Sequence, residues 1–180
     1  MNIAKPVDAA YERALEQIGA LIQGTRADQL TLATPCSDWD VRALINHFIS
    51  GLGRFAAMAS GQRVDFSAPV PDVADRPVAA YRSGLSGLLA AYRDHPEGRA
   101  RTRSIHLIEC AIHAWDLAAA TARAAQLDPT VAVAALAAAE ENLTTDARAG
   151  STAFGPPVPV APHAPPCQRL AGLLGRQPVP

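Results

Sequence analysis

The chain has 180 residues and a formal net charge of -1, and 49% of its residues are hydrophobic although only 5% are aromatic. This length fits one domain with a substantial core. The near-neutral charge gives no electrostatic footprint for nucleic acid or an anionic membrane. No apolar run reaches the roughly 20 residues that a membrane span requires. We therefore expect neither a nucleic-acid partner nor a membrane partner.

Two further features bear on the compartment. Residues 1–7 lack a basic segment followed by an apolar one, which is the pattern of a secretory signal, so we expect a cytoplasmic protein. The chain has three cysteines, Cys36, Cys110 and Cys167, an odd number with no metal-finger spacing. In a reducing compartment we expect them to be free thiols.

Ala and Leu dominate the apolar residues, which favours helices over sheet. Pro6 is well placed as a first helical residue, and apolar residues then recur every three to four positions until near Gly24. Ser37 or Asp38 is expected to cap a second helix that runs to about Ser60. The same periodicity predicts three more helices, at about 75–94, 99–123 and 129–148.

The C-terminal segment differs from the rest, because eight of the fifteen prolines lie between residues 156 and 180. Such a segment is neither regular helix nor central strand, although residues 167–174 predict one short helix. We therefore expect an all-α protein, an antiparallel four-helix bundle with an additional C-terminal helix and a Pro-rich extended tail. Residues 1–154 would form the bundle, and residues 155–180 would pack on the same domain.

The most informative stretch lies in the predicted helix 99–123. His106, Glu109, His113 and Asp116 are spaced by three, four and three residues, so their side chains share an arc about 60° wide. Beside it runs a predicted apolar stripe formed by Ile105, Ile108, Ile112 and Trp115. Residue types that bind metals, pressed against an apolar stripe, are not typical of a solvated helix face.

The spacing predicts a metal site. Glu109 and His113 are one turn apart and can reach a single ion. His47 lies at the edge of the apolar face of the second helix, with open space expected at Gly51, and can supply a third ligand. Two histidines and a carboxylate with an open fourth position form a known catalytic zinc arrangement. The same set serves non-haem iron; zinc is favoured, and nickel, iron and manganese stay open.

Two neighbouring residues can support that site. Asp116 can accept the proton on the other ring nitrogen of His113 and hold its tautomer. His106 is a candidate fourth ligand, general acid or base, or substrate contact. Each feature also has a structural interpretation: His47 as a partly buried histidine, or Asp116 as a partner of Arg123. Both tryptophans are assigned to the core.

Two paired motifs, Thr34–His47 and Glu109–Leu117, together with the segments 154–159 and 169–176, carry a resemblance. They resemble the mycothiol-dependent maleylpyruvate isomerase-like proteins of the DinB-like superfamily of metal-binding bundles. The resemblance implies a DinB-like four-helix bundle whose divalent ion, typically zinc, is held by His47, Glu109 and His113. His106 is not part of that family triad.

The resemblance also implies a low-molecular-weight thiol, mycothiol, as cofactor or co-substrate. Family members isomerise maleylpyruvate or act as thiol S-transferases, so we expect a metalloenzyme that acts on a small electrophilic metabolite. A zinc ion would lower the pKa of a bound thiol, and the thiolate would add to an electrophilic carbon. Candidate contacts for an acidic substrate or the thiol are Arg42, Arg54, Arg101 and Arg103.

Two alternatives stay open at this point. One is a metal-dependent enzyme of small-molecule metabolism that uses metal-bound water and no thiol. The other is a non-catalytic metal-binding protein. The sequence is compatible with either a monomer or a homodimer.

Overall fold

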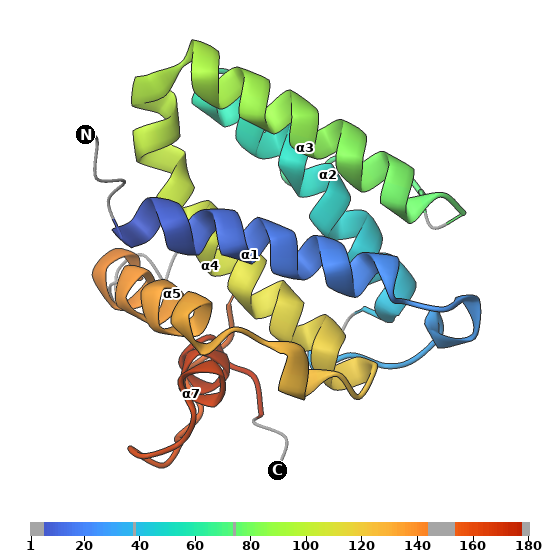
Figure 1. Cartoon of the computed structure of the whole chain (residues 1–180), viewed down its shortest axis with the longest axis vertical. Helices are drawn as coiled ribbons and strands as arrows, with labels where there is room; N and C mark the ends of the chain where they lie inside the picture. The colour runs from blue at the N-terminus through green and yellow to red at the C-terminus, as the bar shows by residue number, and fades with distance from the viewer. Residues whose placement is uncertain (1–5, 38, 74, 144–153, 178–180) are drawn as a thin grey trace.

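The computed structural model describes residues 6–37, 39–73, 75–143 and 154–177, and the regular structure in these ranges is helical. The helices are α1 (Pro6–Gln23), α2 (Val41–Ala59), α3 (Pro77–Asp94), α4 (Pro96–Ala120), α5 (Pro129–Asn142) and α7 (Pro166–Leu173), with short 3-10 turns at Ala27–Gln29 and Ala124–Gln126 (Figure 1). The described ranges contain one isolated β-bridge, between Ala33 and Asp40. The prediction of an all-α, DinB-like bundle is confirmed.

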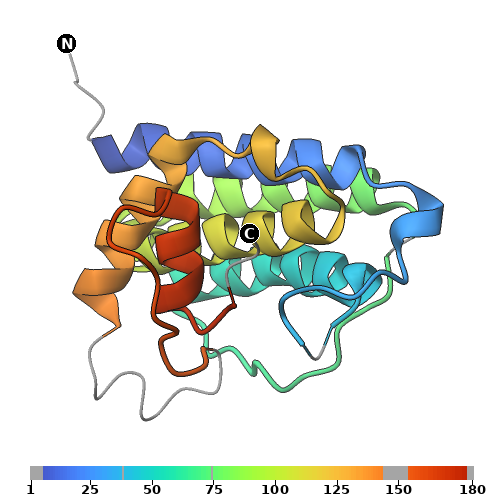
Figure 2. The same cartoon turned by 90° about the horizontal axis from the view of Figure 1, so that it is seen from below.

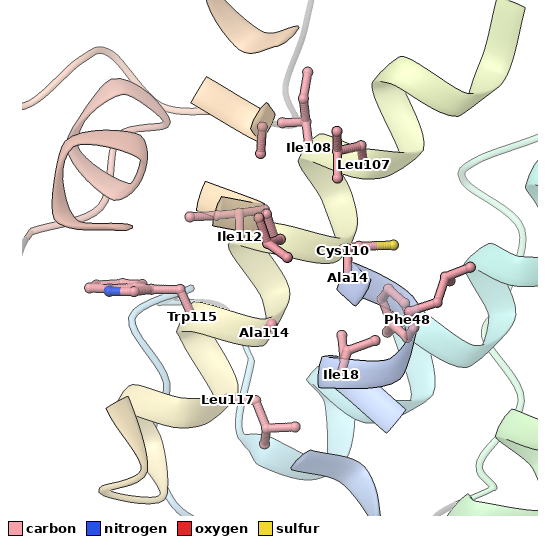
Figure 3. Packing of buried hydrophobic residues seen from close by; sticks show 14 of the residues in the cluster. Ala14, Ile18, Phe48, Leu107, Ile108, Cys110, Ile112, Ala114, Trp115 and Leu117 are labelled. Carbon is pink, nitrogen blue, oxygen red and sulfur yellow. The ribbon is translucent and has the colours of Figure 1, made fainter. Parts of the chain in front are cut away.

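Helix α4 lies at the centre of the molecule, where it contacts α1, α2, α3, α5 and α7. From His106 to Ala118 every residue except Glu109 is buried. A helix that is buried on all sides belongs in the interior rather than on a surface. Figure 3 shows Ile112 and Trp115 on one side of α4, and Cys110 on the other side, toward Ile18 and Phe48.

The remaining helices surround α4. Helices α2 and α3 lie side by side, and α1 crosses α4 (Figure 1). Helix α7 packs against α5 and also contacts α4, which Figure 2 shows from below. The Pro-rich C-terminal segment therefore reaches the central helix. None of the described helices combines the length and the apolar character that a membrane span needs.

Helix α2 begins later than the sequence predicted. Its cap is Asp40, whose carboxylate accepts a hydrogen bond from the backbone N–H of Ala43 at 2.8 Å. The prediction of a cap at Ser37 was wrong, and Asp38 lies outside the described residues. The reason is a compact turn that precedes the helix, closed by a hydrogen bond from the Thr34 hydroxyl to the Trp39 carbonyl at 2.8 Å.

Helix α4 was also predicted with the wrong bounds. It begins at Pro96 rather than Arg99, because a proline at the first helical position lacks only an N–H that has no partner there. It ends at Ala120, since Ala122 has a φ of 55° and reverses the chain. Ile105 is 41% exposed, so the predicted apolar stripe starts one turn later than expected.

Two other bounds differ from the predictions. Helix α3 begins at Pro77 rather than Asp75, again with a proline in its first turn. Helix α5 ends at Asn142, and residues 144–148 of the predicted helix lie outside the described residues.

Candidate metal centre

Three side chains from two helices meet beside α4. Their members are His47 of α2 and Glu109 and His113 of α4, and one ligand atom from each lies within 4.8 Å of the other two. The Nε2 atom of His113 is 3.2 Å from Oε2 of Glu109, and Nε2 of His47 is 3.9 Å from the same oxygen. These are the three residues from which the sequence predicted a metal site.

Both distances to Glu109 are compatible with one shared ion. Two donors that each lie about 2.1 Å from a zinc ion are about 3.4 Å apart in tetrahedral geometry and at most about 4.2 Å apart. Both measured distances fall below that limit. The side chains of His47 and Glu109 are 25% and 20% exposed, whereas that of His113 is 4% exposed. The cluster therefore faces solvent on the side of His47 and Glu109. A Cβ at Gly51 would meet nothing within 4 Å, as expected for open space one turn from His47.

The charges in the cluster favour a cation. Burial alone lowers the pKa of His113, but its hydrogen bonds to Asp116 and Glu109 outweigh burial and raise the pKa to about 9. Burial alone raises the pKa of Glu109, yet its contacts with His113 and His47 hold that pKa well below the ordinary range. At neutral pH Glu109 is therefore ionised and His113 is protonated. A bound metal ion would replace the positive charge of that proton.

Asp116 orients the ring of His113 through its Nδ1 atom. The Nδ1–H of His113 donates to Oδ2 of Asp116 at 3.2 Å, which leaves Nε2 for the cluster. Asp116 is fully buried and also accepts from Arg176, through Nη2 at 3.2 Å and Nε at 3.4 Å. The sequence predicted the contact with His113 but missed Arg176. The alternative partner Arg123 instead donates to Thr25 and Thr121.

Trp39 covers the two histidines. Its ring centroid lies 4.2 Å from that of His47 and 5.8 Å from that of His113. The two imidazoles are 5.0 Å apart and nearly perpendicular, at 74°. The sequence assigned Trp39 to the core, and it does pack against the core, but it also lies against the cluster. A tryptophan next to two candidate ligands had no signal in the sequence beyond its short distance from His47.

His106 lies elsewhere, deep between α1 and α2, and is 1% exposed. Its ring stacks on Phe55 with centroids 4.1 Å apart, and its Nδ1 lies 2.6 Å from the hydroxyl of Tyr11. It is not a member of the three-residue cluster. Burial lowers the pKa of His106 to about 3, so the ring is neutral at pH 7.

A chain of buried hydroxyl groups ends at His106. Four contacts join His106 to Tyr11, Tyr11 to Tyr92, Tyr92 to Thr102, and Thr102 to the carbonyl of Gly98. The hydroxyl of Tyr11 stands at the end of this chain, 2.6 Å from Nδ1 of His106. Burial is also the main reason why the pKa of Tyr11 is strongly raised.

The four arginines predicted as substrate contacts lie outside this cluster. Arg42 pairs with Asp72 at 2.9 Å, and Arg54 donates to the carbonyl of Ala68 at 2.9 Å, so both hold the segment between α2 and α3. Arg103 pairs with Asp8 of α1. Arg101 is exposed and lies eight residues before Glu109, about 12 Å along the helix axis. A role for these arginines in binding stays a prediction.

The fold and the cluster define the class: a DinB-like helical bundle with two histidines and a carboxylate gathered beside its central helix. Comparison with protein families matches residues 11–118 to the family described as "Mycothiol maleylpyruvate isomerase N-terminal domain". The chain belongs to this family, as its motifs indicated. The family relates it to mycothiol and to small-molecule chemistry.

Two relatives come from Mycobacterium tuberculosis: "Uncharacterized protein MT0763" of strain CDC 1551 / Oshkosh and "Uncharacterized protein Rv0738" of strain ATCC 25618 / H37Rv. Each is 33% identical to this chain over 184 residues, which cover 93% of this chain and 96% of the relative. No solved structure matches the chain.

Proposed function

We propose that this protein is a cytoplasmic metalloenzyme that binds one divalent ion at His47, Glu109 and His113. Zinc is the ion that we favour. In this proposal a low-molecular-weight thiol of the mycothiol type is the co-substrate, and a small electrophilic metabolite is the substrate. The observation that carries the proposal is the meeting of three ligand atoms from two helices within 4.8 Å of one another. The family supports the thiol.

The donor set supports the ion. Two imidazole nitrogens and one carboxylate suit zinc and leave a fourth position for a ligand. A bound divalent ion would lower the pKa of a coordinated thiol and polarise a carbonyl group. The exposed sides of His47 and Glu109 let small molecules approach, and the ring of Trp39 packs against that of His47.

The residues around the cluster have separate roles in this proposal. Asp116 holds the Nδ1–H of His113, so that Nε2 faces the ion. His106 is left out of the ligand set and out of proton transfer, because its Nδ1 belongs to the hydroxyl chain and its ring is stacked on Phe55. We assign it instead to the hydrogen-bonded core.

The first test concerns the metal. Purified full-length protein should contain about one equivalent of zinc or another divalent ion, measured by plasma mass spectrometry. After chelation it should bind Co²⁺ and show the d–d bands of a four-coordinate ion. His47→Ala should lose this binding, and His163→Ala, at an exposed position, is the matched control. Stoichiometric metal in the His47→Ala variant would remove that residue from the site.

The second test concerns the thiol. Mycothiol added to the Co²⁺-loaded protein should produce a thiolate-to-cobalt charge-transfer band in the near ultraviolet. A spectrum unchanged by saturating mycothiol would refute the thiol as a ligand, even if the metal site holds. Incubation with an electrophile such as maleylpyruvate then separates two reactions: an isomerase returns the thiol, whereas a transferase keeps its sulfur in the product.

A further inference from the structure

We infer that the C-terminal segment contributes a positioning residue to the metal cluster: Arg176 fixes Asp116, and Asp116 fixes the imidazole of His113. This inference rests on the metal site proposed above. It assigns a role in metal binding to a residue 63 positions away from the ligand that it controls.

The contacts form a continuous buried path. Arg176 reaches both carboxylate oxygens of Asp116, with Nη2 at 3.2 Å from Oδ2 and Nε at 3.4 Å from Oδ1. The same Oδ2 accepts from Nδ1 of His113 at 3.2 Å. Asp116 is 0% exposed and Arg176 is 6% exposed. A buried carboxylate is costly unless it is paired and hydrogen-bonded, so the two-point contact with Arg176 keeps Asp116 in place.

The end of α7 holds Arg176 in position. The backbone N–H of Arg176 donates to the carbonyl of Ala171 at 2.9 Å, and that of Gly175 donates to Gly172 at 3.1 Å. These two bonds, with a φ of 82° at Gly175, form a Schellman motif that ends the helix. The guanidinium also donates from Nη1 to the carbonyl of Leu174 at 2.9 Å. These contacts therefore orient the side chain of Arg176 independently of Asp116.

Phe154 and Gly155 pack against the same turn. The guanidinium carbon of Arg176 lies 6.0 Å from the ring centroid of Phe154. A Cβ on Gly175 would lie 2.7 Å from the Cα of Gly155, so the two glycines allow their backbones to touch. The residues on both sides of the Pro-rich segment thus meet at Arg176. Their packing places the guanidinium of Arg176 beside Asp116.

The path ends at a candidate ligand, which separates this contact from an ordinary ion pair. If Arg176 only stabilised the fold, its removal would lower the free energy of unfolding and leave metal affinity unchanged. Because Asp116 Oδ2 is shared with His113, loss of Arg176 lets the carboxylate and the imidazole turn. Loss of such supporting partners typically costs about 10- to 100-fold in metal affinity.

The experiment measures Co²⁺ affinity and the visible spectrum of the full-length chain. Arg176→Gln should weaken Co²⁺ binding about 10- to 100-fold and shift the d–d bands. Arg176→Lys should recover part of the affinity, because an ammonium group pairs with one oxygen but not with two. Arg169→Gln, at an exposed position on the same helix, is the matched control and should bind as the wild type does.

A double-mutant cycle tests the route through Asp116. Asp116→Asn should also weaken Co²⁺ binding, and Arg176→Gln should add little to that loss if it acts through the carboxylate. Additive losses would overturn the inference, and so would unchanged Co²⁺ affinity in Arg176→Gln, even with lowered stability. Absence of binding in the wild type would instead overturn the metal site itself. If Arg176→Gln does not fold, wild-type affinity in Arg176→Lys and in Asp116→Asn would still refute the positioning role.

Discussion

The protonation of His106 gives a quantitative prediction for the metal-free protein. The unfolded chain takes up a proton at this residue near pH 6.5, whereas the folded chain resists it until pH is about 3. Between these values the unfolded state binds more protons, so stability falls as pH falls. At about 1.36 kcal/mol for each unit of pKa difference, the step from pH 7 to pH 5 costs the folded state about 2 kcal/mol.

The comparison that isolates this effect is wild type against His106→Asn. Asparagine keeps a polar group that can hydrogen-bond to Tyr11 but does not titrate. Urea unfolding with a chelator present, followed by tryptophan fluorescence at pH 7, 6 and 5, gives both free energies of unfolding. The advantage of wild type over the variant should shrink by about 2 kcal/mol between pH 7 and pH 5.

The contribution of His113 is the same in both proteins and cancels from that difference. Removal of one histidine at an exposed position, His163→Asn, controls for effects in the unfolded chain. If the difference between wild type and His106→Asn stays constant from pH 7 to pH 5, His106 accepts a proton in the folded state. The assignment of a neutral ring at pH 5 would then be wrong.

Four more results are expected. Gly98→Ala should destabilise the protein by about 3 kcal/mol or more in urea unfolding, because a Cβ there would lie 1.8 Å from the Ala59 carbonyl oxygen. Gly87→Ala should stabilise the protein by about 0.5–1 kcal/mol, because a Cβ there meets nothing within 4 Å. Tyr11→Phe should cost about 1–3 kcal/mol by the same assay, since it interrupts the buried hydroxyl chain, and an unchanged midpoint would refute that chain. Metal binding at pH 7 should release about one proton, because the pKa of His113 is raised to about 9 and its Nε2 must lose its proton to bind the ion. Calorimetry in buffers of different ionisation enthalpy measures the number of protons released. A binding enthalpy that does not depend on the buffer would contradict the prediction.

Local sequence patterns predicted the helices and the ligand pair. Glu109 and His113 are one turn apart on one helix, so their proximity follows from helix geometry alone. His47 followed from its place at the edge of an apolar face, since that edge meets the neighbouring helix. Helix bounds were less accurate, because Asp40, rather than the earlier polar residues, caps α2.

Tertiary contacts explain what the sequence did not show. Arg176 reaches Asp116 from another helix, and no periodic pattern links residues 60 positions apart. His106 shares its arc with the ligands, yet it is seven residues from His113, about 10 Å along the axis. Its hydrogen bond and its closest ring contact are with Tyr11 and Phe55. A shared face of a buried helix therefore does not imply a shared site.

The two buried histidines of α4 show what makes the cluster suited to a cation. Burial lowers the pKa of both rings, yet the pKa is about 3 for His106 and about 9 for His113. The difference comes from hydrogen bonds to Glu109 and Asp116, which only His113 makes. Positive charge, whether a proton or a metal ion, is therefore stabilised at one end of the buried face and rejected at the other. This is why we propose a site formed by His47, Glu109 and His113 rather than one that includes His106.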